Sequence, residues 1–335
     1  MSFDRLRRRA FITALGGAAA WPLAVRAQQL VNPRHVGVLL VYEQGNPRAQ
    51  ASLAAFQAAL TQLGWTEGRN IEFEHRWVGT ETIRLQQAAQ ELVALHPDLI
   101  LVPGSSSATA AVLQRTRTIP IVFANIVDPV GQGFAASLSR PGGNATGLIN
   151  LEPSMAGKWL DLLKQVLPRV ARVAIPFHPA TSPYADRYLS EVKSMAPSLG
   201  IEVVPGAISD MAAFEMFTAA QAREPNTGLI PVPGIFMSAH AADIVEMIAR
   251  HRVPAIYYLR DFVQAGGLLS YGNDSADNYR RAATFVDRIL RGEKPSDLPI
   301  EIPVKFEMVI NLKTARALGL QIADKLLALA DEVIE

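Results

Sequence analysis

The sequence predicts an α/β protein built as two doubly wound parallel-sheet lobes, and three observations lead to that prediction. The chain has 335 residues, which is enough for two domains of ordinary size. From Val36 onward, short apolar runs alternate with amphipathic stretches of helix length. A turn-rich segment at 140–147 interrupts this alternation, which then starts again. Two successive βαβα arrays favour two parallel sheets with helices on both faces.

The first array begins with a strand at 36–41, which is apolar on both faces as a buried parallel strand should be. A helix at 48–63 ends before Gly64, and residues 71–77 alternate between apolar and charged side chains, the period of a half-covered strand. The array continues with a helix at 81–95, a strand at 99–102, a helix at 106–116 and a strand at 120–124.

The second array opens with a helix at 154–166 whose apolar residues form one stripe. The elements expected next are a strand at 171–177, a helix at 183–196, a strand at 201–204, a helix at 210–222, a strand at 228–232, a helix at 238–251 and a strand at 254–259. Beyond residue 268 the alternation weakens to a strand at 268–272, a helix at 276–290, a Pro-rich stretch, an apolar run at 306–312 and a terminal helix. This tail is too short for a third domain, so its elements are expected to complete the two lobes.

The first 27 residues have the layout of an export signal. Three arginines at 7–9 precede an uncharged stretch at 11–25, and small residues surround an expected cleavage point after Ala27. The arginine pair and the mild apolar stretch are typical of a twin-arginine signal, although Arg7 departs from that motif and leaves the general secretory route open. The uncharged stretch is shorter than the roughly 20 residues that a membrane span takes. We therefore expect an exported, soluble, periplasmic protein with no membrane span in its mature form.

Composition excludes several classes of function. The chain has no cysteine, which excludes disulfides, thiolate catalysis and Cys-ligated metal sites. Residues 1–27 carry five of the 32 basic residues and one of the 31 acidic ones, which leaves the rest with a net charge of about −3 and argues against nucleic acid as a partner. No phosphate-binding loop, dinucleotide fingerprint, nucleophile elbow or ligand-spaced histidine cluster is present. The sequence thus predicts neither a cofactor nor a metal, and it favours binding over catalysis.

Candidate ligand-binding residues follow from the predicted topology. In open parallel sheets, ligands bind beyond the carboxyl ends of the strands. Two sheets that face each other across a hinge would gather these ends in one cleft lined by aromatic, hydroxyl and backbone amide groups. The residues expected in this cleft are Tyr42, Gly104, Ser105, Ser106, Asn125, Asp128, Phe177, Tyr184, Phe236, Tyr257 and Asp261.

Each group of candidates also has a purely structural interpretation. Ser105 and Ser106 open a helix, where free N–H groups and hydroxyls suit a carboxylate, but either serine could simply cap that helix. Asn125 and Asp128 could accept hydrogen bonds from a ligand ammonium or hydroxyl, or could shape a turn. The aromatic candidates could form the walls of an apolar site, or could pack in the core.

Motifs along the whole chain carry a resemblance to a known family. They lie at 8–12, 20–23, 27–28, 63–65, 67–70, 119–123, 128–131, 138–147, 265–272, 289–295, 305–307 and 318–320. Together they resemble the substrate-binding proteins of ABC-type importers, in the type I periplasmic-binding family related to tryptophan- and tyrosine-binding members.

The resemblance implies two lobes joined by three hinge crossings near 148–151, 267–271 and 298–303. Lobe one would then comprise residues 33–149 and 270–298, and lobe two would comprise residues 150–269 and 299–335. It also implies a monomer that closes on its solute and is recognised in the closed state by an ABC permease in the inner membrane.

The predicted ligand is a small organic solute, either an amino acid or an aromatic carboxylate. Its carboxylate would meet Ser105 and Ser106, and its body would lie between Tyr42 on one side and Phe177, Phe236 and Tyr257 on the other. The alternative is a periplasmic α/β enzyme, a hydrolase, that uses Ser106 and His178 in the same cleft. A regulator with a sensory core of this fold is disfavoured by the export signal and by the lack of a basic helix that could read DNA.

Overall fold

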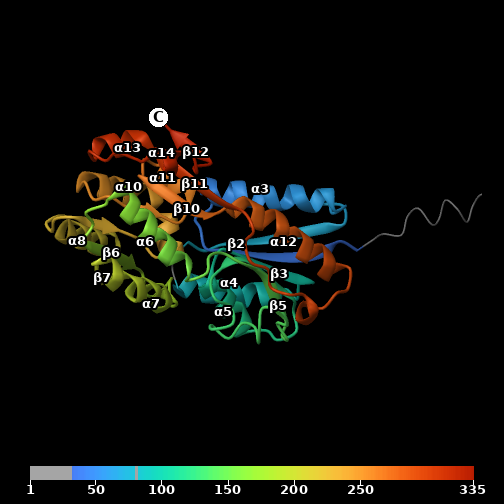
Figure 1. Cartoon of the computed structure of the whole chain (residues 1–335). Coiled ribbons are helices and arrows are strands. Elements are labelled where there is room, and N and C mark those ends of the chain that lie inside the picture. Colours follow the sequence, from blue (N-terminus) through green and yellow to red (C-terminus); the bar gives the residue numbers. More distant parts are fainter. Residues whose placement is uncertain (1–31, 80–81) are drawn as a thin grey trace, which may run out of the picture.

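Two α/β lobes lie side by side in the computed structural model, which describes residues 32–79 and 82–335 (Figure 1). The export signal expected at residues 1–27 lies outside the described residues. Among the helices that the structure describes, none is both long enough and apolar enough to cross a membrane.

Lobe one contains a parallel sheet in the order β2-β1-β3-β4-β5. Its strands are β1 (Arg34–Leu40), β2 (Ile71–Trp77), β3 (Leu99–Pro103), β4 (Ile121–Ile126) and β5 (Ala145–Ile149). Side chains alternate between its faces, so that Val38 and Leu40 of β1 enter one core cluster while Leu39 enters the other. The apolar runs seen in the sequence therefore fill both faces of this sheet.

Helices cover both faces of the lobe-one sheet. On one side lie α3 (Pro47–Gln62) and α12 (Ser275–Leu290), which pack against each other although more than 200 residues separate them in sequence (Figure 1). On the other side lie α4 (Thr82–Ala94) and α5 (Ser106–Leu113). The sheet is thus doubly wound, as the sequence predicts.

Lobe two contains two sheets that share one core. The first, in the order β7-β6-β8, is built from β6 (Arg172–Phe177), β7 (Glu202–Ala207) and β8 (Thr227–Leu229). The second, in the order β12-β11-β10-β9, is built from β9 (Ile256–Tyr257), β10 (Leu269–Asn273), β11 (Phe306–Asn311) and β12 (Glu332–Ile334). A bridge between Leu229 and Ala255 connects the two sheets. Because β10 and β11 run antiparallel, this lobe is not wholly parallel, contrary to the prediction.

The helices of lobe two surround this core. They are α6 (Met155–Val166), α7 (Ala185–Met195), α8 (Met211–Ala222), α9 (Ile235–Ala239), α10 (Ala241–Arg250), α11 (Arg260–Gln264), α13 (Leu312–Ala317) and α14 (Asp324–Leu327), and the short 3-10 helices of the chain are Ala196–Leu199 and Pro295–Asp297. The single helix predicted at 238–251 is divided into α9 and α10 at His240, whose φ of −108° is not helical.

Strands β5 and β12 were not predicted. Residues 145–147 belong to a sequence segment that is typical of a turn, yet Ala145, Thr146 and Gly147 pair with β4. Gly147 has a φ of +144°, and a Cβ atom at this position would lie 1.9 Å from the carbonyl oxygen of Phe123. Glycine is therefore required here by the close approach of two strands, a long-range contact that local composition does not reveal.

The chain passes between the lobes three times, within the expected ranges at the first and third crossings and slightly later than expected at the second. The first follows β5, since Ile149 still pairs within the lobe-one sheet. The second follows Asn273, because the whole of β10 pairs with β9 and β11, so residues 270–273 belong to lobe two. The third follows Glu301, whose backbone N–H donates to the Gly147 carbonyl at 2.9 Å. Residues 299–301 therefore lie with lobe one.

Candidate ligand-binding cleft

A small cavity lies where the two lobes meet. Its volume is about 30 Å³, close to the volume that one water molecule occupies in the liquid. It is lined by Gly104, Ser105, Ser106, Asn125, Val127, Asn150, Thr181, Tyr184, Gly234, Ile235, Ser238 and Tyr258. No lining residue carries a formal charge. The lobes are close together in this conformation, so a ligand of amino-acid size requires a wider separation between them.

The lobe-one wall is formed by the turn that leads from β3 into α5. Gly104 adopts a φ of +77° at this turn, and Ser105 caps the helix by accepting a hydrogen bond from the N–H of Ala108 at 3.1 Å. The capping interpretation of Ser105 is therefore correct. The Ser106 hydroxyl accepts from Nε2 of Gln132 at 3.2 Å. Within the described chain, the backbone N–H groups of Ser106 and Ser107 have no hydrogen-bond acceptor, as is usual in a first helical turn.

Asn125 lies at the hinge end of the cavity and connects three segments. Its φ is +56°, and its Oδ1 accepts from Nδ2 of Asn278 at 2.6 Å and from Nδ2 of Asn273 at 3.4 Å. Asn278 also donates to the Ile149 carbonyl at 3.0 Å. The carbonyl oxygen of the Asn125 side chain is thus used within the protein, and this residue joins β4, β10 and α12.

Asn150 is a cavity residue that sequence reasoning missed. Its Oδ1 is buried and has no hydrogen-bond partner among the described residues. A buried acceptor without a donor is costly, so this oxygen is available to a ligand N–H or O–H group. The residue was overlooked because it follows β5, the strand that the turn-rich sequence concealed.

The lobe-two wall presents two tyrosines. The Tyr184 hydroxyl donates to the Pro233 carbonyl at 3.2 Å, and the Tyr258 hydroxyl lies 2.9 Å from Oγ of Ser238. Burial raises the pKa of both phenols above the usual value, so both are neutral at physiological pH. These rings supply apolar surface and hydroxyl groups to the same wall.

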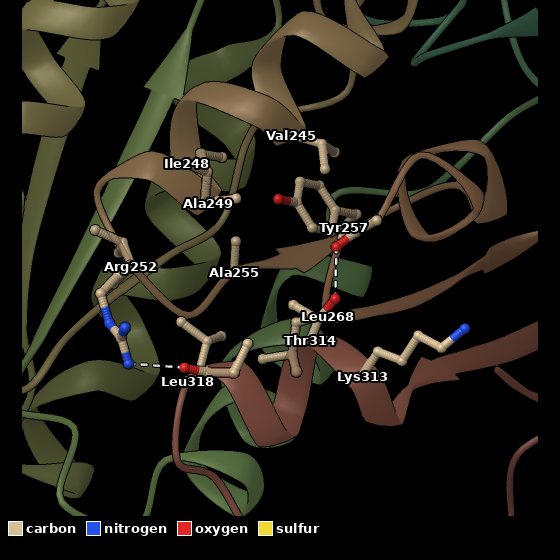
Figure 2. Close-up of a pocket in the computed structure, with 14 residues that line it drawn as sticks. Val245, Ile248, Ala249, Arg252, Ala255, Tyr257, Leu268, Lys313, Thr314 and Leu318 are labelled. Atoms are coloured by element: carbon tan, nitrogen blue, oxygen red, sulfur yellow. Dashed lines mark hydrogen bonds between the residues drawn. The ribbon is translucent and has the colours of Figure 1, made fainter. Parts of the chain in front are cut away.

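Tyr257, a sequence-predicted site residue, lies outside this cavity. Tyr257 is the last residue of β9, and it is the next residue, Tyr258, that lines the cleft. Tyr257 points instead into a different cavity, bordered by α10 and α13 (Figure 2). The prediction was wrong by one residue, because a strand buried on both faces carries no polar alternation that marks the cleft side.

Phe177 and Phe236 do not line the cavity either. Phe177 packs against the lobe-two core, and Phe236 stacks on His178 with 4.5 Å between ring centroids. His178 is hydrogen-bonded through Nδ1 to the Thr181 hydroxyl at 3.1 Å and through Nε2 to the Ser209 carbonyl at 3.2 Å. Burial lowers the pKa of His178. Since Ser106 pairs with Gln132, the Ser106–His178 arrangement that a hydrolase needs is not formed.

Tyr42 and Asp261 lie at one side of the cavity, where an ion pair joins the lobes. Asp261 of α11 pairs with Arg48 of α3. Burial lowers the pKa of the Arg48 guanidinium, but its neighbours Tyr42 and Asp261 more than offset this and raise it above the usual value. Burial also raises the pKa of Tyr42, which is next to Arg48. In this conformation these residues, which the sequence predicts as ligand contacts, form a charged contact between the lobes.

Asp128 takes part in a second interlobe ion pair, at another side of the cavity. Its Oδ2 lies 2.8 Å from Nη1 of Arg187 in α7, and its Oδ1 accepts from the N–H of Gly131 at 3.0 Å. The prediction that Asp128 shapes a turn is correct, and its carboxylate also bridges the lobes. Among the residues that the structure describes, no group of three or more His, Asp or Glu side chains could hold a metal ion.

Comparison with known proteins identifies similar chains. A family described as ABC transporter substrate binding protein matches residues 36–334. A tyrosine-binding protein of Clostridioides difficile (strain R20291) is 25% identical over 290 residues, which are 86% of this chain and 81% of that protein.

Solved structures share the fold. A conserved domain protein from Vibrio cholerae has 25% sequence identity and a TM-score of 0.83, over 90% of this chain and all of that one. The ABC domain from Streptococcus pneumonia in complex with L-Trp has 22% identity, the same TM-score of 0.83 and coverage of 90% of this chain and 100% of that one. The ligand-free, open structure of a Clostridium difficile substrate-binding protein with adhesive properties has 20% identity and a TM-score of 0.67, over 90% and 99% of the two chains.

Proposed function

The chain belongs to the ABC transporter substrate-binding protein family, and from this premise we propose that it captures a carboxylate-bearing organic solute in the interlobe cleft and delivers it to an importer. The solute is an amino acid or an aromatic carboxylate. It is bound and released without chemical change.

One observation carries this proposal: the start of α5 faces two tyrosines across an uncharged interlobe cavity. The unpaired N–H groups at this helix start, together with the positive end of the helix dipole and the hydroxyls of Ser105 and Ser106, suit a carboxylate. Tyr184 and Tyr258 on the opposite wall suit an apolar or aromatic body. The names of two relatives, a tyrosine-binding protein and a complex with L-Trp, support the same class of ligand.

Asn150 completes the proposed site. The buried Oδ1 of Asn150 is an acceptor without a donor, and a ligand ammonium or hydroxyl would satisfy it. The cavity offers no carboxylate to an ammonium group, since both nearby acids, Asp128 and Asp261, are paired with arginines of the opposite lobe. An aromatic carboxylate therefore fits this lining with fewer unsatisfied charges than an amino acid does.

Export and partnership follow from the same proposal. Residues 1–27 would direct the protein to the periplasm by the twin-arginine or the general secretory route, and the mature chain would act as a monomer. The two interlobe ion pairs stabilise a closed form, and an ABC permease would recognise that form because only it presents both lobes in a fixed arrangement.

The test begins with the ligand that accompanies the purified protein. Native mass spectrometry identifies it, and calorimetry with L-tyrosine, L-tryptophan and a series of aromatic carboxylates ranks the candidates. A ligand at a hundred times its dissociation constant should raise the free energy of unfolding by about 2.7 kcal/mol. Scattering profiles should change when the ligand is added, because the bound ligand fixes the separation of the lobes.

Two outcomes would overturn the proposal. Identical scattering profiles with and without saturating ligand would exclude closure around a solute. Recovery of the ligand in a chemically altered form would favour the alternative, a periplasmic α/β hydrolase that acts in the same cleft.

A further inference from the structure

A second cavity lies in lobe two, on the side of β9 that faces away from the cleft. Its volume is about 300 Å³, at the lower end of the roughly 300–1,000 Å³ that is common for small-molecule sites. Apolar side chains form most of its wall, among them Val245 and Ile248 of α10 and Leu318 at the end of α13 (Figure 2). This cavity is ten times larger than the 30 Å³ interlobe cavity lined by Ser105 and Tyr258.

Tyr257 places an unpaired hydroxyl in this cavity. Its side chain is almost completely buried, with 1% of the residue surface exposed, and its hydroxyl makes no hydrogen bond within the described chain. Figure 2 shows the ring entering the space between α10 and α13 with the hydroxyl directed inward. Because this hydroxyl has no partner in the described chain and borders the cavity, it is available to a ligand acceptor.

The position of the Tyr257 ring is fixed by its surroundings. The ring stacks on Phe262 with 4.8 Å between centroids and an interplanar angle of 11°. It also lies over Gly267, where a Cβ atom would come within 2.6 Å of its Cε2. Since the ring cannot turn toward another acceptor without breaking these contacts, the hydroxyl stays directed into the cavity. Burial raises the pKa of this phenol, so it is a neutral donor.

Arg252 supplies a positive charge at the edge of the same cavity. It is exposed and donates from Nη2 to the Ala317 carbonyl at 2.7 Å, and it forms no ion pair with a described residue (Figure 2). A guanidinium has five N–H donors in a fixed plane, so several remain for an anion. The cavity therefore combines an apolar wall, a neutral hydroxyl donor and an exposed cation.

We propose that this cavity is a second ligand site, which binds a compact apolar carboxylic acid that carries another oxygen acceptor. The carboxylate binds Arg252 at the cavity edge, the apolar body packs against Val245, Ile248 and Leu318, and the second oxygen accepts a hydrogen bond from Tyr257. The site is distinct from the interlobe cleft, because Tyr257 lines this cavity and Tyr258 lines the cleft, and the two cavities share no lining residue.

The probe for this site is para-acetylbenzoate, which has a carboxylate and a ketone oxygen at the two ends of an apolar ring. Calorimetry and saturation-transfer NMR on the whole mature chain measure its binding. Two matched compounds each lack one polar end: para-isopropylbenzoate lacks the ketone oxygen, and para-methylacetophenone lacks the carboxylate. We expect each to bind at least fivefold more weakly than the probe.

Variants assign the binding to the cavity. Tyr257→Phe should weaken probe binding at least fivefold while leaving the affinity for para-isopropylbenzoate unchanged. Arg252→Gln should weaken both benzoates but not para-methylacetophenone. Residue 252 has a φ of +55°, and Arg252→Gln leaves the backbone strain at this position unchanged because neither side chain is glycine. Tyr258→Phe, which changes the cleft and not this cavity, should leave probe binding unchanged.

The proposal is overturned if the probe shows no saturable binding, or if Tyr257→Phe and Arg252→Gln bind it as the unchanged protein does. It is also overturned if Tyr258→Phe alone weakens the probe, because the probe would then occupy the cleft. Ala249→Phe, which fills the cavity, should abolish binding. Because Tyr257→Phe removes a single oxygen, it gives a result even if Ala249→Phe does not fold.

Discussion

Nη1 of Arg187 in lobe two lies 2.8 Å from Oδ2 of Asp128 in lobe one, so an ion pair holds the lobes together at one side of the cleft. Arg48 and Asp261 form a second interlobe ion pair elsewhere along the same cleft. None of the four residues in these two pairs lines the central cavity. Ligand affinity should therefore depend on residues that stabilise the closed form as well as on residues that touch the ligand.

Replacing Arg187 by Gln should weaken ligand binding by up to about fivefold. The Arg187 side chain is 54% exposed, and a pair of this exposure contributes about 0.2–1 kcal/mol. Calorimetry at low and high salt measures the effect, which should shrink as salt screens the pair. Arg169→Gln changes an exposed arginine of the same lobe and serves as the control. Equal affinities for the two variants would contradict a role of the ion pair in closure.

Replacing Ser105 by Asp should weaken the binding of carboxylate ligands at least tenfold, whereas Ser105→Asn should change it much less. Both side chains cap a helix about as well as serine, so α5 should keep its stability in both variants. Only the aspartate adds a negative charge where the ligand carboxylate is expected. Calorimetry with each variant checks this difference, and denaturant titrations confirm equal stability. Similar affinities of the Asp and Asn variants would mean that no carboxylate meets Ser105.

Two adjacent tyrosines should respond differently to loss of their hydroxyls. Tyr258→Phe should lower the free energy of unfolding by about 1 kcal/mol, because the hydroxyl contacts Ser238 at 2.9 Å and the Gly234 carbonyl at 3.2 Å. Tyr257→Phe should change it by less than about 0.5 kcal/mol, because the Tyr257 hydroxyl borders a cavity and makes no hydrogen bond within the described chain that the substitution could remove. Urea denaturation of both variants measures the difference. The reverse order would show that Tyr257 has the partner and Tyr258 does not.

Replacing Gly147 by Ala should destabilise lobe one by about 3 kcal/mol or more. The new Cβ atom would lie 1.9 Å from the Phe123 carbonyl oxygen, and residue 147 has a φ of +144°. Gly143→Ala is a matched control only four residues earlier, since a Cβ there meets nothing within 4 Å. It should change stability by less than about 0.5 kcal/mol. Equal unfolding free energies of the two variants would contradict the close pairing of β4 and β5.

Stability should fall as the pH drops below about 6.5, and His178→Gln should reduce that slope. Burial against Phe236 lowers the pKa of His178, so the folded state binds fewer protons than the unfolded state in this range. The stabilisation is fully present above the unfolded pKa of 6.5 and is lost as the pH falls through the folded one. Urea denaturation between about pH 5 and pH 8 measures the slope.

The control for this pH dependence is His35→Gln, since the His35 side chain is 61% exposed. His75 also has a pKa lowered by burial, so His178→Gln should reduce the slope without abolishing it. The nearby Asp210 carboxylate opposes the shift of His178, and His240 adds to it. An unchanged slope in His178→Gln would show that His178 titrates alike in both states.

The order of helices and strands could be predicted because hydrophobic periodicity is a local property. The apolar run that became β1 and the stripe that became α6 each bury their own residues in the core. Strands β5 and β12 were missed because their pairing partners, β4 and β11, decide their structure and their local sequences are ambiguous. Of the candidates chosen from strand ends, Gly104, Ser105, Ser106, Asn125 and Tyr184 line the interlobe cavity.

The sequence by itself determined that two α/β arrays follow each other and that the start of a Ser-rich helix lies at a strand end. Only the tertiary structure decided that Tyr258 and not Tyr257 faces the cleft, and that Asn150 at the first crossing lines it. It alone also decided that Asp128 and Asp261 are paired with arginines of the opposite lobe. The physical reason is distance along the chain. A contact such as that between Arg48 and Asp261 joins residues more than 200 positions apart, and no local pattern of residues encodes it.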